Sequence, residues 1–146
     1  QKLVMSFHGL PVRCTELGDP YCRDSYETAR ALADRLGLND DDFLVTFQSR
    51  FGPAAWLQPY TEPTLEELAK TGVTKIDVVC PGFVADCLET LEEITVEVKD
   101  TFMAAGGEQF RYIPCLNDDP AWIDALTSMV EQHLQGWPTQ EDHITG

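Results

Sequence analysis

The fold is decided by the stretch KIDVVCPGFVADCLETLEEI, residues 75–94. Its first part, residues 75–81, is a short apolar and β-branched run bounded by turn residues, which is typical of a strand. A helical pattern follows over residues 85–105, and Gly106 is the expected stop signal just past its end. A strand followed closely by a helix is the building unit of parallel α/β sheets.

The same unit recurs along the chain. Three further runs predict strands: KLVMSF (residues 2–7), FLVTFQ (43–48) and QFRYIP (109–114). Further helical patterns, each closed by a glycine, cover residues 25–36, 64–71 and 120–135. The sequence therefore predicts an α/β fold with an open parallel four-stranded sheet flanked by helices. We expect one domain over residues 1–136 and a loose tail, without periodicity, over residues 137–146.

Composition and charge exclude several classes of function. The 146 residues include 25 acids against 10 Lys and Arg, a formal net charge of -15. Such a charge argues against a nucleic-acid partner, because phosphate backbones are bound mainly by Lys and Arg, and it favours cations. No apolar run approaches the roughly 20 residues that span a bilayer, and no leader opens the chain, so a soluble protein is expected. Five cysteines without a CxxC pair indicate reduced thiols in the cytoplasm.

Candidate site residues follow the predicted strands. Open α/β sheets bind ligands beyond the carboxyl ends of their strands, so the residues at those ends meet at one edge. They are Ser6, His8 and Gly9 after the first strand, Gln48, Ser49, Arg50 and Trp56 after the second, Phe83 after the third, and Asn117 after the fourth.

An acidic ladder starts near the end of the third strand. At ~100° per residue, a helix over residues 85–105 presents Leu88, Leu91, Thr95, Val98 and Phe102 on one face, and Asp86, Glu89, Glu93 and Glu97 on the other. Like charges at this spacing repel one another unless a cation compensates. A solvated helix face is the usual explanation of such a run. The alternative is a row of oxygen ligands for a divalent cation, which the position beside His8 favours.

The single residues have structural explanations as well. A lone histidine after a strand is more often packed or hydrogen-bonded than catalytic, but His8 paired with Glu89 is a plausible proton acceptor or metal ligand. Arg50 fits either a substrate carboxylate or a structural ion pair. Trp56 and Phe83 suit either the core or flat apolar walls for a planar ligand.

Three motifs resemble one enzyme family, and they occur in the family's order: SFHGLP (residues 6–11), TFQSRFGPAAWLQPYT (46–61) and CPGFVADCLETLEEI (80–94). The chain resembles ferrochelatases, protoheme ferro-lyases of the bacterial, proteobacterial type, from residue 3 to about residue 135. The resemblance implies the C-terminal half of a chelatase-like enzyme with two α/β halves and a porphyrin cleft between them. It further implies insertion of ferrous iron into protoporphyrin IX, the last step of heme synthesis.

The resemblance also implies roles for particular residues. His8 matches the family's active-site histidine and Glu89 its active-site glutamate, while Glu93 and Glu97 match an acidic row that often lies on a widened, π-type helix. We assign His8 as the base and a metal contact, and Glu89 as the start of a metal path. The other expected contacts are Asp86, Glu93 and Glu97 for the metal, and Ser6, Arg50, Trp56 and Phe83 for the porphyrin.

Departures from the family shape the remaining expectations. Cys87 stands where some members have a histidine, and no cysteine follows Cys115, so no iron-sulfur cluster is expected. Ferrous iron is a substrate, and no tightly bound cofactor is needed. The N-terminal half is missing, so we expect it as a partner and expect the chain to catalyse poorly alone. The expected location is cytoplasmic, and an apolar lip near Phe51 and Trp56 makes peripheral contact with the inner membrane reasonable.

Three other functions stay open at this point. The chain would also fit a chelatase for another tetrapyrrole or metal, such as coproporphyrin with iron, or sirohydrochlorin with cobalt or iron. A noncatalytic tetrapyrrole or metal carrier would keep the acids and aromatic walls without needing a base. A thiol hydrolase built on Cys80 or Cys87 with His8 lacks a recognisable nucleophile turn.

Overall fold

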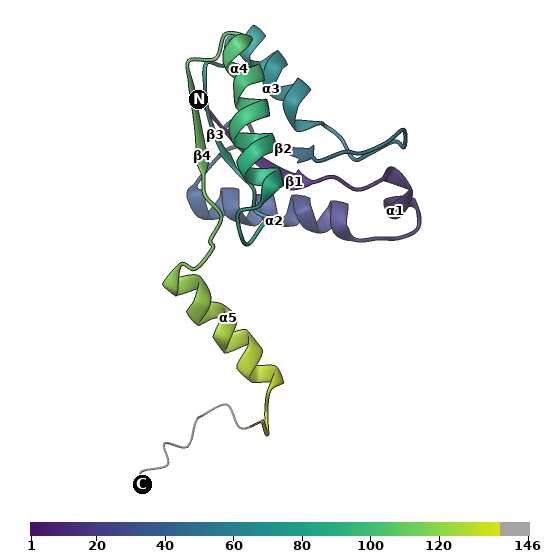
Figure 1. The fold of residues 1–146 in the computed structure, drawn as a ribbon, viewed down its shortest axis with the longest axis vertical. Coiled ribbons are helices and arrows are strands. Elements are labelled where there is room, and N and C mark those ends of the chain that lie inside the picture. The colour runs from purple at the N-terminus through teal and green to yellow at the C-terminus, as the bar shows by residue number, and fades with distance from the viewer. Residues whose placement is uncertain (138–146) are drawn as a thin grey trace. The chain divides into compact units, whose positions relative to one another are not determined.

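A single parallel sheet forms the centre of the first of two units, residues 1–115. The structure is a computed structural model that describes residues 1–137. Its four strands, all parallel in the order β2-β1-β3-β4, are β1 (Lys2–His8), β2 (Phe43–Gln48), β3 (Lys75–Val79) and β4 (Gln109–Ile113) (Figure 1). The predicted open parallel sheet is confirmed.

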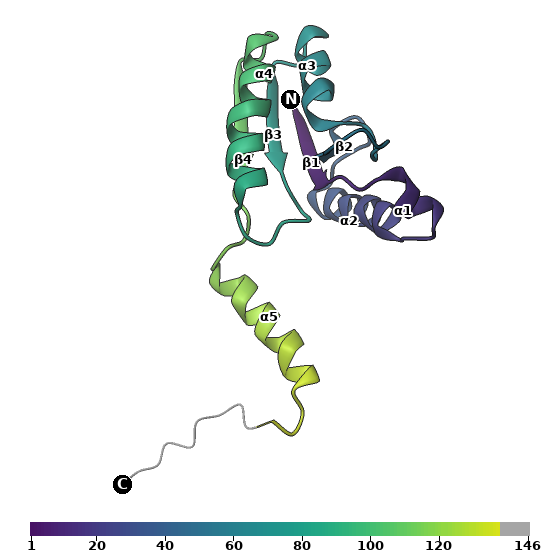
Figure 2. The same cartoon turned by 45° about the vertical axis from the view of Figure 1, so that its right-hand side comes forward.

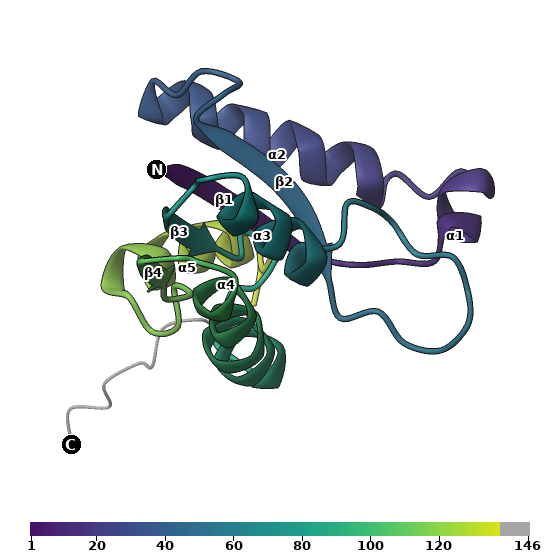
Figure 3. The ribbon, with the colours of Figure 1, turned by 90° about the horizontal axis from the view of Figure 1, so that it is seen from above.

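Helices cover both faces of this sheet. The first face carries α2 (Tyr21–Leu36), and the second carries α3 (Thr61–Lys70), η1 (Glu89–Val98) and α4 (Lys99–Ala104) (Figure 3). On the second face α3 and α4 lie side by side (Figure 2). A short helix, α1 (Val12–Glu16), follows β1.

Side-chain alternation along β1 explains these two layers. Met5 and Phe7 pack with Ala29 and Ala33 of α2, whereas Val4 packs with Leu65 of α3 and with the helices that follow β3. Because successive strand residues point to opposite faces, Ser6 and His8 lie on the Val4 side. The second face therefore carries the candidate site.

Two predicted helices begin earlier in the structure than in the sequence pattern. α2 starts at Tyr21 instead of residue 25, and Asp19 accepts a hydrogen bond from its first backbone N–H at 2.9 Å. α3 starts at Thr61 instead of residue 64, with Pro63 in its first turn, where proline is tolerated because no intrahelical donor is lost. The glycine stop signals are confirmed for Gly37 and Gly72, whose φ angles are 68° and 98°.

The continuous α-helix predicted over residues 85–105 is wrong. Helical structure begins at Leu88, is π-type over Glu89–Val98 and becomes α-helical only in α4. The widened helix that the resemblance implied is thus confirmed. A turn of a π-helix contains more residues than a turn of an α-helix, so different positions face the core. Along this wider helix, residues four apart stay nearly aligned.

The buried residues of this segment accordingly lie at intervals of four: Thr90, Ile94, Val98 and Phe102. Leu88 and Leu91, which the sequence analysis placed on the core stripe, are 74% and 53% exposed.

Gly9 allows β1 to leave the sheet close to β2. A Cβ at this position would lie 2.9 Å from the carbonyl oxygen of Gln48 and 3.3 Å from the Trp56 ring, whereas one at Gly82 meets only contacts of 3.4 Å or more. We expect Gly9→Ala to lower the free energy of unfolding by about 1–3 kcal/mol, as overpacking does. Gly82→Ala, the matched control, should stay within about 0.5 kcal/mol in urea unfolding. Equal losses in the two variants would contradict the crowding argument.

The second unit comprises residues 116–146, described as far as residue 137. It contains α5 (Pro120–His133), which confirms the helix predicted there, and the Asp119 side chain caps it by accepting from the backbone N–H groups of Ala121 and Trp122. The predicted tail lies, from residue 138 onward, outside the described residues, and the domain limit at residue 136 stays a prediction. Within residues 1–137, no helix is both long and apolar enough to cross a membrane.

Candidate active site

His8 ends β1 at the carboxyl edge of the sheet, in register with Gln48 of β2. Its Nδ1 lies 2.7 Å from the carbonyl oxygen of Gly9. A carbonyl oxygen only accepts, so Nδ1 carries the hydrogen, and the neutral ring keeps its lone pair on Nε2. The backbone of His8 is also held, because its carbonyl accepts from the Tyr21 hydroxyl at 2.9 Å. The ring is therefore oriented with a free acceptor nitrogen.

Glu89 begins η1 within electrostatic reach of His8. The pKa of its carboxyl lies below the ordinary value, chiefly because the Cys87 thiol donates a hydrogen bond to it, with a smaller contribution from the charge of His8. Hydrogen bonds and opposite charges both favour the ionised form of a carboxyl group. Near neutral pH Glu89 is thus ionised and lies within electrostatic range of His8.

Two aromatic residues lie near this pair in different ways. The Phe83 ring centroid is 6.2 Å from that of His8, and Phe83 also packs against the core beneath. Trp56 is half-buried in the loop after β2, where its indole N–H donates to the carbonyl of Phe51 at 3.0 Å. Phe51 itself is 86% exposed.

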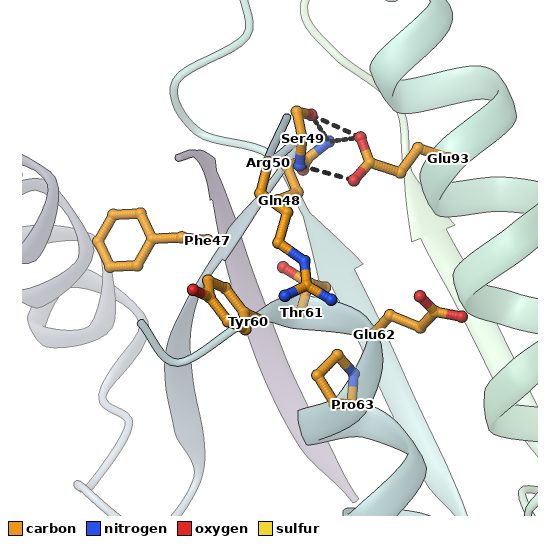
Figure 4. A pocket seen from close by; sticks show the side chains of 9 residues that line it. All are labelled: Phe47, Gln48, Ser49, Arg50, Tyr60, Thr61, Glu62, Pro63 and Glu93. Carbon is orange, nitrogen blue, oxygen red and sulfur yellow. Dashed lines mark hydrogen bonds between the residues drawn. The ribbon is translucent and has the colours of Figure 1, made fainter. Parts of the chain in front are cut away.

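An open groove runs along η1 beside this edge. It has a volume of about 390 Å³ and is lined by Ser49, Arg50, Phe51, Leu88, Glu89, Glu92, Glu93 and Glu97. We call this cavity the acidic groove and call Glu89, Glu93 and Glu97 the acidic row. Glu92 also lines the groove, which sequence analysis missed because an α-helix would turn it away. A smaller cavity of about 50 Å³ adjoins it (Figure 4), where the Arg50 guanidinium lies 4.4 Å from the centre of the Tyr60 ring.

Glu93 is held by the end of β2. Its carboxylate accepts from the backbone N–H of Ser49 at 2.7 Å, from the Ser49 hydroxyl at 2.5 Å and from the side-chain amide of Gln48 at 3.3 Å (Figure 4). Sequence analysis placed Gln48 and Ser49 at this edge without giving them a role. Their position directly after a strand was the only available signal.

Ser6 and Asp86 lie apart from the groove lining. Ser6 is fully buried, and its hydroxyl contacts the side chains of Gln48 and Thr61, each at 2.8 Å. Asp86 precedes the helix, so the ladder starts at Glu89 and not at Asp86. Its carboxylate accepts from the Tyr112 hydroxyl at 2.7 Å. Within the described residues, no three His, Cys, Asp or Glu side chains gather closely enough to hold a metal ion.

Comparison with known protein families shows which family the chain belongs to. The family model described as ferrochelatase matches residues 1–134. The chain belongs to the ferrochelatase family. Curated ferrochelatases of Bordetella pertussis, Herminiimonas arsenicoxydans and Dechloromonas aromatica are 70%, 61% and 58% identical to it, over 94–95% of the chain. The chain spans about 38% of the length of each of these ferrochelatases.

A solved structure shares the fold. It is described as a cobalamin (vitamin B12) biosynthesis CbiX protein from Marinobacter aquaeolei VT8, with a TM-score of 0.57 and 15% identity. The match covers 91% of this chain and 96% of that one. At this identity the likeness concerns the arrangement of the sheet and helices alone.

Cys80 gives no support to a nucleophilic thiol in this ferrochelatase-family chain. Its thiol is buried and donates to the side-chain oxygen of Gln48 at 3.4 Å, and burial raises its pKa far above the ordinary range. Because the thiolate is the nucleophile, such a cysteine stays inert near neutral pH.

Cys87 is the main cause of the lowered pKa of Glu89. We expect Cys87→Ala to raise the pKa of Glu89, since the lost hydrogen bond favoured the ionised form. Cys87→Ser, which keeps a donor, should leave the pKa lower than in the alanine variant, and His8→Ala should produce a smaller rise. Carbon-13 NMR titration of the Glu89 carboxyl measures all three, and an unchanged value in Cys87→Ala would exclude the thiol as the cause.

Proposed function

We propose that the chain forms part of an enzyme that inserts ferrous iron into protoporphyrin IX to give protoheme. Membership of the ferrochelatase family supports the reaction class. The observation that carries the proposal in this chain is His8, held by its Nδ1 hydrogen bond within electrostatic range of Glu89, which lines a groove together with further acids.

His8 is the proposed base. Metal insertion releases two protons from pyrrole nitrogens, and a positioned imidazole takes up such protons at its unprotonated nitrogen. The hydrogen bond from Nδ1 to the Gly9 carbonyl keeps Nε2 available as the acceptor. Once protonated, the His8 ring carries a positive charge. The nearby negative charge of the Glu89 carboxylate then lowers the energy of this imidazolium form.

The acidic row is the proposed path of the ferrous ion. Glu89, Glu93 and Glu97 are spaced by four residues and all line the acidic groove. Carboxylate oxygens bind hard divalent cations and exchange for their water ligands. Because the row starts at Glu89, a cation that moved along it would arrive beside His8. Asp86, which precedes η1, is proposed as a further contact, although its carboxylate also accepts from the Tyr112 hydroxyl.

The macrocycle is proposed to lie against apolar side chains at this edge. Phe83 stands beside His8, and Trp56, Phe51 and Leu88 supply further apolar surface from the loop after β2 and from the start of η1. Flat apolar walls are what a planar ligand requires. Arg50 lines the groove and is the proposed partner of a porphyrin carboxylate, while the buried Ser6 supports the edge through Gln48.

The rest of the protein is the proposed partner of this chain. The curated relatives are more than twice as long, and the net charge of -15 is unfavourable for a dianionic porphyrin. The missing part is therefore expected to supply a facing wall and basic residues. A cytoplasmic location and peripheral membrane contact through the exposed Phe51 complete the proposal.

The decisive experiment joins this chain to the remaining part of the Bordetella pertussis relative. Protoporphyrin absorbance is followed after anaerobic addition of ferrous iron, with the chain alone as control. We expect metalloporphyrin from the joined protein and little from the chain alone. Porphyrin binding without metal insertion would instead indicate a carrier. Faster turnover with coproporphyrin or with cobalt would reassign the substrate.

A further inference from the structure

Ser49 adopts a backbone conformation that serines rarely take. Its φ of 63° lies in the left-handed region, where a residue other than glycine is uncommon and carries a cost of order 1–3 kcal/mol. In this conformation its backbone N–H and its hydroxyl both point to one carboxylate, that of Glu93, at 2.7 and 2.5 Å. The strained residue thus makes a two-point contact with η1 from the end of β2.

Gln48 joins the same contact to the rest of the sheet. It is 3% exposed, and its side-chain oxygen accepts from Ser6 of β1 and from Cys80 just after β3. Its side-chain nitrogen donates to the backbone carbonyl of Glu89 at 2.8 Å and to Glu93 at 3.3 Å. One buried amide therefore connects three strand ends with the first turn of the π-helix.

These hydrogen bonds leave Glu93 little choice of orientation. An ionised carboxylate oxygen accepts about two hydrogen bonds. Oε2 already accepts from Ser49 and Gln48, and Oε1 accepts from the Ser49 N–H. One acceptor position on Oε1 is left for a further ligand.

Glu93 differs in this respect from its neighbours in the acidic row. No hydrogen bond from the end of β2 reaches the carboxylate of Glu89 or Glu97 within residues 1–137.

We propose that Gln48 and Ser49 are positioning residues that fix Glu93 as a one-oxygen contact for the divalent cation. This inference rests on the proposed function, in which the acidic row carries the ion. A carboxylate held in advance binds without first losing side-chain freedom. Because it presents one oxygen instead of two, it also leaves the ion able to move on to the next ligand. The strained backbone of Ser49 then serves the site, because it holds the Glu93 carboxylate in place.

Two substitutions at Ser49 separate positioning from folding. Ser49→Ala removes the hydroxyl and keeps the strain, whereas Ser49→Gly removes the hydroxyl and relieves the strain. In the joined enzyme we expect both to raise the KM for ferrous iron about tenfold. The KM for protoporphyrin and the kcat at saturating iron should stay within about twofold, and Ser49→Gly should unfold at no lower urea concentration than Ser49→Ala.

Controls complete the design. Thr71→Ala removes an exposed hydroxyl that contacts only α3 carbonyls, and it should leave every constant unchanged. Gln48→Met should raise the KM for iron as Ser49→Ala does, with an added loss of stability. A KM for iron within twofold of wild type in both Ser49 variants would overturn the positioning role.

A second readout keeps this inference separate from the proposed function. Cobalt(II) is titrated into the chain alone and into its Ser49→Ala variant. If the joined wild type inserts no iron, the proposed function fails, and tenfold weaker cobalt binding by the variant would still uphold the positioning role. Equal cobalt binding, or none by either protein, would overturn it. Normal insertion with unchanged constants would reject the positioning role and leave the function standing.

Discussion

His8→Ala is expected to lower the kcat of the joined enzyme about a hundredfold, the lower end of what a positioned acid or base contributes. The imidazole is oriented by Gly9 and lies within electrostatic range of Glu89, so its removal leaves solvent to accept the pyrrole protons. The KM for protoporphyrin should change far less, because His8 presents mainly one nitrogen to the ring. Steady-state kinetics with each substrate varied in turn measures both constants.

The matched control for this experiment is His133→Ala. His133 is exposed near the end of α5, and its replacement should leave kcat unchanged. A loss of less than threefold in His8→Ala would remove His8 from the role of base. The free energy of unfolding of each variant is compared in urea, so that a folding defect is recognised.

Glu89→Gln is expected to lower kcat/KM for ferrous iron about a hundredfold. The substitution keeps the size of the side chain and removes the charge beside His8. Both proposed effects are lost together, namely the carboxylate ligand for the ion and the stabilisation of protonated His8. Initial rates at limiting iron provide the measurement.

The control must reproduce the change in net charge. Glu27→Gln removes an exposed carboxylate from α2, on the opposite face of the sheet, and should leave the rate unchanged. If the Glu27 and Glu89 variants lost activity equally, the effect would come from overall charge, and Glu89 would have no specific role.

The sheet could be predicted because each strand carries its own signal. Short apolar runs, closing glycines and the alternation with helical patterns are local features, and they indicated the order of elements that the structure shows. The edge at which the ends of β1 and β2 place His8 and Gln48 then followed from topology alone.

The π-helix could not be predicted from local periodicity. Its first turn is bound by Gln48, 41 residues away along the chain, through the carbonyl of Glu89. Assuming ordinary α-helical spacing placed Leu88 and Leu91 in the core and turned Glu92 away from the groove. The resemblance to ferrochelatases contained this information, whereas the residue pattern did not.

The roles of Gln48, Ser49 and Ser6 were hidden for a related reason. Their polar side chains could face either a ligand or the interior. For Ser49 that choice depends on its left-handed turn, and for Ser6 on its distant partners Gln48 and Thr61. No residue in the stretch requires such a turn, because serine adopts it only under tertiary constraint. Ser6 was accordingly expected at the porphyrin, but it lies beneath the edge.

The four-residue spacing along η1 ties its acidic face to its buried face. Each acid of the row directly precedes a buried residue, in the pairs Glu89 and Thr90, Glu93 and Ile94, and Glu97 and Val98. A point substitution of one acid leaves the buried residues in place. Insertion or deletion of a single codon within the segment would shift carboxylates toward the core and apolar side chains toward the groove. A change in the length of η1 is therefore expected to disturb both of its faces at once, whereas a point substitution alters one side chain.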